Sequence, residues 1–545
     1  MSPHPDPATT HAVENQPPEF APRDLWRDDL ALREAVDREG ARSFVEALAR
    51  YGALAGDTLY ALAHDAHRDR PRLRTHDRFG HRIDRVEFHP AYHGLMDAAV
   101  GHGVAGLSWR PPGPGAHVAR AALSYLHHQA DPGTSCPLTM THAAVPVLRR
   151  EASLAEWADK AAAPHYDAAE APIADKPGVT LGMGMTEKQG GSDVRANTST
   201  ATPDGDGYRL VGHKWFFSAP MSDGFLVLAQ APAPGGLTCL LMPRRLPDGS
   251  KNAFELVRLK DKLGDWSNAS SEVEFRGARA WRVGEEGRGI ATILEMVMLT
   301  RLDCMLGSAA QMRMALAHAV HHARHRRAFG KRLIDQPLMG TVLADLALEA
   351  EAALALSMRV AGAVDRAPTD ASEAAFARIA TAIGKFWVCK RAPAFVNEAQ
   401  ECLGGAGYVE ESVLPRLYRQ APLNSIWEGS GNVQCLDVLR ALAREPDTGA
   451  AVWDEVQVDA GAGHAALVAR LKPSLLQGQA IAPEAARGFV SSLALALQGA
   501  VLARAGSPWV DAFSRSRIGP DRGGVFGASP PVDDAAALVE RALPT

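Results

Sequence analysis

The stretch that decides the fold is Gly182-Met-Gly-Met-Thr-Glu-Lys-Gln-Gly-Gly-Ser-Asp-Val194. Before it, apolar residues recur at intervals of three and four, which is the spacing of amphipathic helices. From Gly178 the pattern changes to short β-rich runs separated by turns such as Asp204-Gly205-Asp206-Gly207. The chain is therefore predicted to pass from helices into a β-domain at this stretch.

Small residues make the same stretch a candidate ligand-binding loop. Gly190, Gly191 and Ser192 would let backbone N–H groups approach an anionic or flat ligand. The side chains of Thr186 and Ser192 add hydroxyl donors. No G-x-G-x-x-G turn leads into a helix here, so the stretch does not predict a Rossmann fold. A tight β-turn capped by Ser and Thr is the alternative.

The flanking segments divide the chain into four parts. Residues 1 to about 25 are polar and rich in Pro, and predict a disordered segment or an extended arm. Helices are then expected over 29–51, 58–67, 91–101, 118–131 and 138–155. Strands are expected over 179–185, 208–218, 224–231, 237–243, 254–260 and 271–275. Long helices return over 290–324, 337–366, 371–402 and 431–444, followed by shorter ones over 462–475, 483–505 and 533–542.

These segments predict an α+β protein. We expect an N-terminal arm and helical domain (1–177), a middle antiparallel β-barrel domain (178–288), a C-terminal four-helix bundle (289–444) and a helical C-terminal extension (445–545).

Composition indicates a soluble protein of several domains. The chain has 545 residues and a net charge of −5, so no overall charge attracts it to nucleic acid or to an anionic membrane. Its six cysteines have no CxxC spacing, which indicates free thiols in a reducing cytoplasm and neither a disulfide framework nor a zinc site. The N-terminus shows no secretory signal. The uncharged stretch Gly488–Ala503 is short for a membrane span and predicts a buried helix.

A short polar loop, Asn424–Asn432, lies between two long helical patterns and carries Glu428 between Trp427 and a glycine. An apolar neighbour with few water partners raises the pKa of a carboxylate toward the range useful for taking a proton. The loop alone leaves two hypotheses open. Glu428 is either a catalytic base or a cap for the helix that begins near Gly431.

Three successive aromatic residues mark the strand that ends at Ser218. Alternation places Trp215 and Phe217 on one face, and Phe216 with Ser218 on the other. A large ring beside a hydroxyl suits a flat heteroaromatic ligand that also needs a hydrogen bond. Ordinary packing in a β-core is the alternative.

Other polar residues favour structural roles. Four histidines with i,i+4 spacing lie on one predicted helix: His318, His321, His322 and His325. No nearby Asp or Glu supports a metal site, so we expect a polar helix face or ring stacking at an interface. His213 and Lys214 are expected to face solvent.

Taken together, these motifs resemble the flavin-dependent acyl-CoA dehydrogenases. Residues 182–194 are similar to that family's MTEPGAGSDV signature, and Trp-Phe-Phe-Ser takes the place of its W-I-S/T strand. Four further elements follow in the family's order: GEEGRG (284–289), RRAFGK (326–331), LGGAGY (403–408) and IWEGSGNVQ (426–434). The DKLGDWSNAS sequence (261–270) and the C-terminal extension look like the adaptive-response subgroup of the family.

The resemblance implies FAD as cofactor, an acyl-CoA substrate and a homo-oligomer, expected to be a tetramer. Glu428 would be the base that takes an α-proton from the thioester, and Arg301 and Trp427 would lie near the substrate. Ser218 would lie near N5 of the flavin, and Arg326 would reach the FAD pyrophosphate of a neighbouring subunit. The implied flavin-binding set is Met185, Thr186, Gly191, Ser192, Phe216, Phe217, Ser218, Arg326, Ile426, Trp427, Gly429, Ser430 and Asn432.

Three positions depart from the family pattern. Ala328 replaces a Thr, and Glu401 stands where the family has a Gln and would repel an FAD phosphate unless it is paired. These two changes weaken the expected FAD contacts between subunits. Trp427 is bulkier than the usual Tyr and is expected to narrow the acyl pocket.

The adaptive-response subgroup is expected to bind duplex DNA through its C-terminal extension. From Glu445 to Thr545, however, eight basic residues stand against eleven acidic ones, which gives a net charge of −3. Because phosphate neutralisation drives DNA binding, an acidic tail is poorly suited to it. The only basic cluster is Arg515, Arg517 and Arg522, for which a solvated loop is the alternative.

Overall fold

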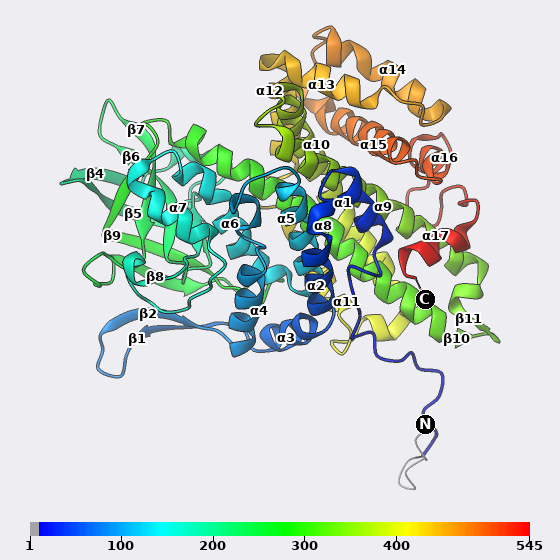
Figure 1. Cartoon of the computed structure of the whole chain (residues 1–545), viewed down its shortest axis with the longest axis horizontal. Coiled ribbons are helices and arrows are strands. Elements are labelled where there is room, and N and C mark those ends of the chain that lie inside the picture. The colour runs from blue at the N-terminus through cyan, green and yellow to red at the C-terminus, as the bar shows by residue number, and fades with distance from the viewer. Residues whose placement is uncertain (1–9, 545) are drawn as a thin grey trace.

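The N-terminal part of the protein is a layer of helices that packs on a central helix bundle (Figure 1). The computed structural model describes residues 10–544. Asp131 accepts hydrogen bonds from the N–H groups of Gly133 and Thr134, and Pro132 follows it, so α6 begins where its free donors are capped. The helices are α1 (Leu30–Arg38), α2 (Val45–Ala55), α3 (Thr58–Arg68), α4 (Pro90–Gly101), α5 (Ala116–Ala130), α6 (Pro132–Leu148) and α7 (Ala155–Ala162).

An extended arm precedes α1 and runs along the end of a long bundle helix, α8 (Gly289–His325). The Phe20 ring stacks on the His318 ring with the centroids 3.8 Å apart, and His321 Nε2 bonds the Pro18 carbonyl at 2.9 Å. The expected arm is therefore ordered against α8 from residue 10 onward, and His318 stacks on it. Residues 1–9 lie outside the described part of the chain.

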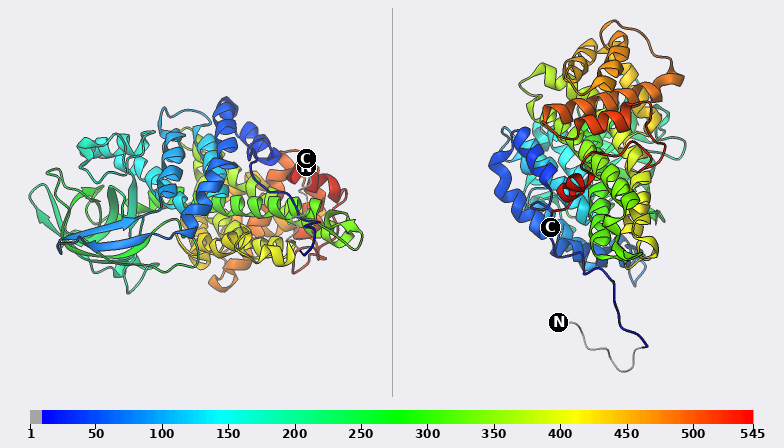
Figure 2. Two further views of the ribbon diagram at one scale, coloured as in Figure 1. Left: turned by 90° about the horizontal axis from the view of Figure 1, so that it is seen from below. Right: turned by 90° about the vertical axis from the view of Figure 1, so that its right-hand side faces the viewer.

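A β-hairpin interrupts the N-terminal helices. β1 (Arg72–His76) pairs antiparallel with β2 (Arg82–Glu87), and Arg82 Nη2 donates to the Leu256 carbonyl of the barrel at 3.0 Å. Figure 2 shows this hairpin reaching along the barrel. The hairpin was not predicted, because its two short strands carry four arginines and only a few apolar residues.

The middle domain is a closed barrel. Its strands run in the order β3-β6-β4-β5-β9-β7, and β7 also pairs with β6, which closes the ring. β3 pairs with β6 in parallel, so the barrel is not wholly antiparallel as predicted. β4 was also missed, and β9 extends beyond the predicted segment. The strands are β3 (Leu181–Gly184), β4 (Thr200–Asp204), β5 (Gly207–Ser218), β6 (Gly224–Ala231), β7 (Gly236–Pro243), β8 (Phe254–Leu259) and β9 (Ser270–Val283).

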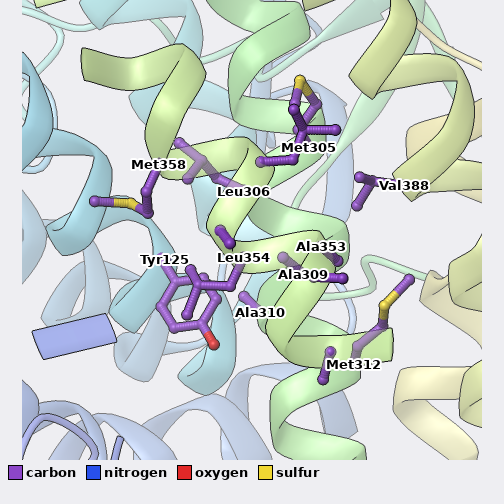
Figure 3. Close-up of a cluster of buried hydrophobic side chains, with 14 of the residues drawn as sticks. Tyr125, Met305, Leu306, Ala309, Ala310, Met312, Ala353, Leu354, Met358 and Val388 are labelled. Carbon is purple, nitrogen blue, oxygen red and sulfur yellow. The ribbon is translucent and has the colours of Figure 1, made fainter. Parts of the chain in front are cut away.

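Long helices form the central bundle, as the sequence predicted. They are α8, α9 (Pro337–Arg366), α10 (Ala371–Glu401) and α12 (Gly431–Arg444), with the short α11 (Leu414–Gln420) before the Glu428 loop. Figure 3 shows part of the core, where Met305 and Leu306 of α8 lie among Leu354 and Met358 of α9 and Val388 of α10. This packing fixes the helix face from which Thr300 projects.

The C-terminal extension packs on the bundle through α15, which contacts α9, α10 and α13. α15 lies in the one described helix long and apolar enough to cross a membrane, and 67% of that apolar window is buried inside the protein. Its role as a buried helix is therefore confirmed. The helices are α13 (Pro446–Val456), α14 (Ala462–Leu476), α15 (Ala486–Arg504), α16 (Val510–Phe513) and α17 (Ala535–Ala542).

Candidate active site

Glu428 lies in the loop between α11 and α12, with its side chain turned to α8. The Thr300 hydroxyl donates to Glu428 Oε2 at 2.8 Å. Ser430, and not Glu428, is the N-cap of α12, and no side chain caps its free N–H groups. The structure therefore contradicts the helix-cap hypothesis and leaves the Glu428 carboxylate free for a chemical role.

Side chains from three helices hold the backbone of this loop. Lys385 Nζ on α10 donates to the Trp427 and Gly429 carbonyls at 2.7 and 2.6 Å. Gln434 Nε2 on α12 donates to the Glu428 carbonyl at 3.0 Å, as does Arg301 Nε on α8 at 3.0 Å. These donors oppose the strain of Glu428, whose φ of 59° is in the left-handed region.

Burial dominates the electrostatics of the Glu428 carboxylate. Its desolvation raises the pKa of Glu428, while the Thr300 hydrogen bond and the positive charges of Lys385 and Arg301 lower it. The net direction is upward, toward the range in which a carboxylate accepts protons efficiently. This agrees with a general base.

The barrel offers an open face made by Phe216 and Ser218. Phe216 is 52% exposed although it is a large apolar residue. Ser218 Oγ lies 3.0 Å from Ser270 Oγ on the neighbouring strand. An exposed ring beside a hydroxyl is a surface that a flat ligand would cover.

Phe217 does not belong to that face. Its ring is fully buried inside the barrel and packs against Phe225, with the centroids 4.3 Å apart. The expectation that Phe217 binds the cofactor is therefore corrected for its side chain, which is a core residue.

A buried ion pair fixes the glycine-rich loop beside this face. Lys214 Nζ bonds Glu187 Oε1 at 2.7 Å, and both side chains are fully buried. The N–H of Thr198 also donates to Glu187, at 2.7 Å, and the pKa of Glu187 falls to about 2 because Lys214 and these donors outweigh its desolvation. Lys214 was expected to face solvent, which is wrong. A bulge in β5 between Lys214 and Phe217 turns both side chains inward.

Gly191 packs closely against the Thr186 side chain in this loop. A Cβ on Gly191 would lie 3.0 Å from Thr186 Oγ1, so a larger residue would press on that hydroxyl. The Thr186 carbonyl accepts from the Trp215 N–H at 2.8 Å, which ties the loop to β5. The loop thus keeps Thr186 beside the Phe216–Ser218 face.

Cys136, near the start of α6, links the two walls of the site and was not identified from the sequence. Its thiol lies close enough to both Ser218 and Glu428 for each of them to influence its pKa. Burial raises the pKa of Cys136 to about 12, so the thiol stays neutral. The structure thus brings the Ser218 face and Glu428 to the same helix end, which spacing along the chain could not reveal.

Comparison with known proteins decides the family. Models match three parts of the chain: the adaptive response protein AidB N-terminal domain (15–168), the acyl-CoA dehydrogenase middle domain (182–278) and the acyl-CoA dehydrogenase C-terminal domain (287–443). AidB of Escherichia coli (strain K12) is 51% identical over 441 residues, which span 80% of this chain and 81% of that protein. The chain belongs to the acyl-CoA dehydrogenase family.

Other members of the family share its sequence or its fold. Acyl-CoA dehydrogenase family member 11 of Caenorhabditis elegans is 31% identical over 431 residues, which span 76% of this chain and 69% of the relative. The structure of Caenorhabditis elegans ACDH-11 in complex with C11-CoA matches with a TM-score of 0.83 and 26% identity, covering 99% of this chain and 93% of that one. Butyryl-CoA dehydrogenase of Megasphaera elsdenii shares the fold at a TM-score of 0.56 and 22% identity, covering 78% of this chain and 100% of that one.

In this family member, Trp427 and Arg301 are held from within the protein. Trp427 Nε1 donates to Asn424 Oδ1 at 3.0 Å, which fixes the indole beside Glu428. Arg301 is 6% exposed, and besides the Glu428 carbonyl it bonds Asp437 at 2.9 Å. The guanidinium of Arg301 therefore supports the loop that carries Glu428, and its expected place near the substrate stays a prediction.

The other residues that were predicted to bind the flavin differ in their exposure to solvent. Ile426, two residues before the half-buried Glu428, is 61% exposed, so it is a second large apolar side chain open to solvent. Gly429 has a φ of 95°, and Ser430 and Asn432 begin α12. Met185 is half-buried at the end of β3, and Ser192 is exposed on the glycine-rich loop.

Arg326 lies far from Glu428 along the same chain. It follows the end of α8, which at 1.5 Å per residue is roughly 35–40 Å from Thr300. Arg326 Nη1 donates to the Asn15 carbonyl at 2.7 Å. Its predicted FAD contact stays a prediction. Phe329, in the turn between β10 (Arg327–Ala328) and β11 (Lys331–Arg332), is 98% exposed.

The three arginines predicted to bind DNA differ in availability. Arg517 is buried and bonds Asp345 at 2.5 Å and Glu349 at 2.8 Å, so its predicted contact with DNA is corrected: its charge anchors the extension to α9. Arg515 pairs with Asp533 at 2.7 Å. Arg522 is exposed.

Proposed function

We propose that the protein is an FAD-dependent acyl-CoA dehydrogenase in which Glu428 takes the α-proton of an acyl-CoA thioester. The observation that carries this proposal is the half-buried Glu428, whose carboxylate has a raised pKa and accepts a hydrogen bond from Thr300, together with the exposed Phe216 ring of the barrel. Family membership and the C11-CoA complex of the Caenorhabditis elegans neighbour support the substrate class.

The residues present fit FAD. Phe216 and Ile426, both large, apolar and exposed, would be covered by the ring, and the lack of a side chain at Gly191 lets the loop backbone approach it closely. Ser218, Thr186 and Ser192 supply hydroxyl donors along that surface. When bound, FAD would accept the β-hydride of the thioester.

The chain's own residues then prepare proton removal. Thr300 orients the Glu428 carboxylate, and Lys385, Gln434 and Arg301 hold the loop carbonyls so that the carboxylate does not move away. Trp427 restricts the space beside Glu428 and keeps water out, which maintains the raised pKa. The backbone N–H of Glu428 is proposed to donate to the thioester oxygen and stabilise the enolate-like charge.

Assembly and location belong to the same proposal. A homotetramer would let Arg326 of one subunit reach FAD held by another, and the exposed Phe329 would be covered in such an interface. All six cysteines are buried free thiols, which supports a reducing cytoplasm.

Flavin bleaching tests the proposal. Purified protein should carry FAD or take it up, and short and branched acyl-CoA thioesters should bleach it under anaerobic conditions. Glu428→Gln should keep the flavin and slow bleaching by roughly 10²–10⁴-fold, whereas the exposed Glu484→Gln should behave as wild type. Protein that binds no FAD, or a Glu428→Gln variant that bleaches normally, would overturn the proposal.

A second candidate, binding of duplex DNA, is supported by the hairpin and not by the C-terminal extension. Between Arg68 and Arg85 the chain carries seven arginines and three aspartates. The side chains of Arg72, Arg74 and Arg85 are 75%, 56% and 55% exposed, and Arg74 lies directly opposite Arg85. Like charges in that position repel, but each arginine is paired with a carboxylate (Arg72 with Asp69, Arg74 with Glu87 and Arg85 with Glu170), so DNA phosphates would have to replace these partners.

Measuring DNA binding at two salt concentrations distinguishes the hairpin from the C-terminal extension as the DNA-binding surface. We expect a labelled duplex to bind more weakly at 200 than at 50 mM salt, in the manner of about three phosphate contacts. Replacing Arg72, Arg74 and Arg85 together by Ala should reduce both the affinity and its salt dependence. The matched pair Arg515→Ala and Arg522→Ala should change neither. The opposite pattern would assign DNA to the extension, and absence of binding would remove this candidate.

A further inference from the structure

A cavity of 580 Å³ lies outside the Glu428 loop, between α4, the segment 166–170 and one end of the barrel. It borders the proposed active site without including it. Ala219 follows Ser218 and Pro137 follows Cys136 in the chain, and both line the cavity, whereas Glu428, Thr300 and Phe216 do not. We call it the α4 cavity.

Aromatic rings form one wall of the α4 cavity. Phe88 stacks on Tyr92 with the centroids 3.9 Å apart and the planes 11° apart. His93 meets the edge of Tyr92 at 5.4 Å and stacks on Tyr166 at 6.0 Å, and its Nδ1 hydrogen-bonds the Tyr166 hydroxyl at 2.9 Å. The thioethers of Met96 and Met221 also line the space. Rings and thioethers favour a flat aromatic ligand.

Two donors at this cavity have no partner in the described structure. Ser222 is 3% exposed, and its Oγ makes no hydrogen bond. Nε of Arg245 is likewise buried and unpaired. Nearly all buried polar groups in folded proteins are paired, because an unmade hydrogen bond in a buried place is unfavourable. Both residues line the α4 cavity, so an acceptor atom placed in it would satisfy them.

The charges around the cavity favour a neutral acceptor. The Glu170 carboxylate forms salt bridges with Arg245 at 2.8 Å, with Arg244 at 3.1 Å and with Arg85 at 3.1 Å. Glu87 forms a salt bridge with Arg74 at 2.8 Å. Asp167 adds a further carboxylate to the lining. The cations are therefore already paired, and an additional anion would meet three carboxylates. A carbonyl oxygen accepts hydrogen bonds without bringing charge.

We propose that the α4 cavity binds a planar, uncharged aromatic carbonyl compound, with its rings against Tyr92 and Tyr166 and its oxygen accepting from Ser222. This goes beyond the proposed dehydrogenase reaction and does not depend on Glu428. The cavity volume lies within the usual range for small-molecule sites, and like many of them it lies between two domains.

A matched pair of compounds tests the proposal on the full-length protein. 9-Fluorenone is flat and carries one carbonyl, and fluorene has the same rings without it. Titration calorimetry should show fluorenone binding more tightly than fluorene. Ser222→Ala should weaken fluorenone by roughly tenfold, the value of one hydrogen bond to a buried donor, and leave fluorene unchanged.

Two further variants keep the test decisive. Ser222→Thr retains the hydroxyl and should restore fluorenone binding, and Tyr166→Leu should weaken both compounds because it removes part of the wall. Ser492→Ala, in an exposed position on α15, is the control and should change nothing. Three results would each overturn the proposal: equal affinities for both compounds, a fluorenone affinity that Ser222→Ala leaves unchanged, or no binding up to the solubility limit. The last result would mean that water alone occupies the cavity.

Discussion

At the scale of single residues, Glu428 combines two unfavourable features. Its carboxylate is desolvated although the residue is only half-buried, and its backbone adopts a left-handed conformation that costs about 1–3 kcal/mol for a residue with a side chain. Neither would persist without the donors from Thr300, Lys385 and Gln434. The surrounding helices therefore hold one carboxylate in a place it would not otherwise occupy, which is typical of a catalytic group.

The hydrogen bond from Thr300 predicts a pH dependence. It lowers the pKa of Glu428 against the larger upward effect of burial, so Thr300→Val should raise that pKa further. Because the base must be deprotonated, flavin reduction should begin at higher pH in the variant, and at neutral pH it should be roughly tenfold slower. Stopped-flow reduction measured across pH provides the test. Thr341→Val, which removes an exposed hydroxyl on α9, is the control.

The same raised pKa has a consequence for stability. A carboxyl whose pKa is higher when folded contributes stability below its unfolded pKa of 4.5, and loses that contribution as pH rises through the folded value. Glu428→Gln should therefore have a higher Tm than wild type at pH 8 and no advantage at pH 4. A variant that is less stable at pH 8 would contradict the assigned burial.

At the scale of elements, the glycine-rich loop depends on the ion pair of Lys214 and Glu187. Lys214→Met would leave a buried carboxylate unpaired, which costs about 3–5 kcal/mol, and should also weaken FAD retention. Urea unfolding and the flavin absorbance of the purified variant measure the two effects. The exposed Lys331→Met is the control, and adding Glu187→Gln to Lys214→Met should recover part of the loss. Unchanged stability in Lys214→Met would contradict this account.

Sequence periodicity predicted the long elements well and the irregular ones poorly. α9 and α12 begin and end at the predicted residues, because each has a sustained apolar stripe between clear breaks. The hairpin β1–β2 was missed because its two short strands carry four arginines and only a few apolar residues. Lys214 was misplaced because a bulge reverses the alternation within β5, and a bulge leaves no mark in the residue types.

In the candidate site, too, some residues could be predicted from the sequence and others could not. The Glu428 loop and the faces of Phe216 and Ser218 could be predicted from residue types and from resemblance to the family. Cys136, Glu187 and Lys385 could not, since each acts through a contact between segments far apart in the chain. The bonds of Arg301 to the Glu428 carbonyl and to Asp437 could not be predicted either, since a sequence match shows its position and not the direction of its guanidinium.

At the scale of the whole molecule, the three parts meet around one loop. The barrel supplies the aromatic face, α6 supplies Cys136, and α8, α10 and α12 hold Glu428 (Figure 1). Arg517 helps to join the extension to these parts, because it forms salt bridges with Asp345 and Glu349 on α9. Arg517 thus serves packing, whereas Arg522 of the extension is exposed. Arg72 and Arg74 are exposed on the β1–β2 hairpin, which lies at the other side of the protein (Figure 2).

The most direct measurement of the central claim is anaerobic titration of the FAD-loaded protein with an acyl-CoA thioester, comparing wild type with Glu428→Gln. The account predicts that wild-type flavin absorbance bleaches and that the variant keeps its flavin but bleaches at least about 10²-fold more slowly. Equal bleaching by both proteins, or by neither with any thioester tried, would contradict the role assigned to Glu428.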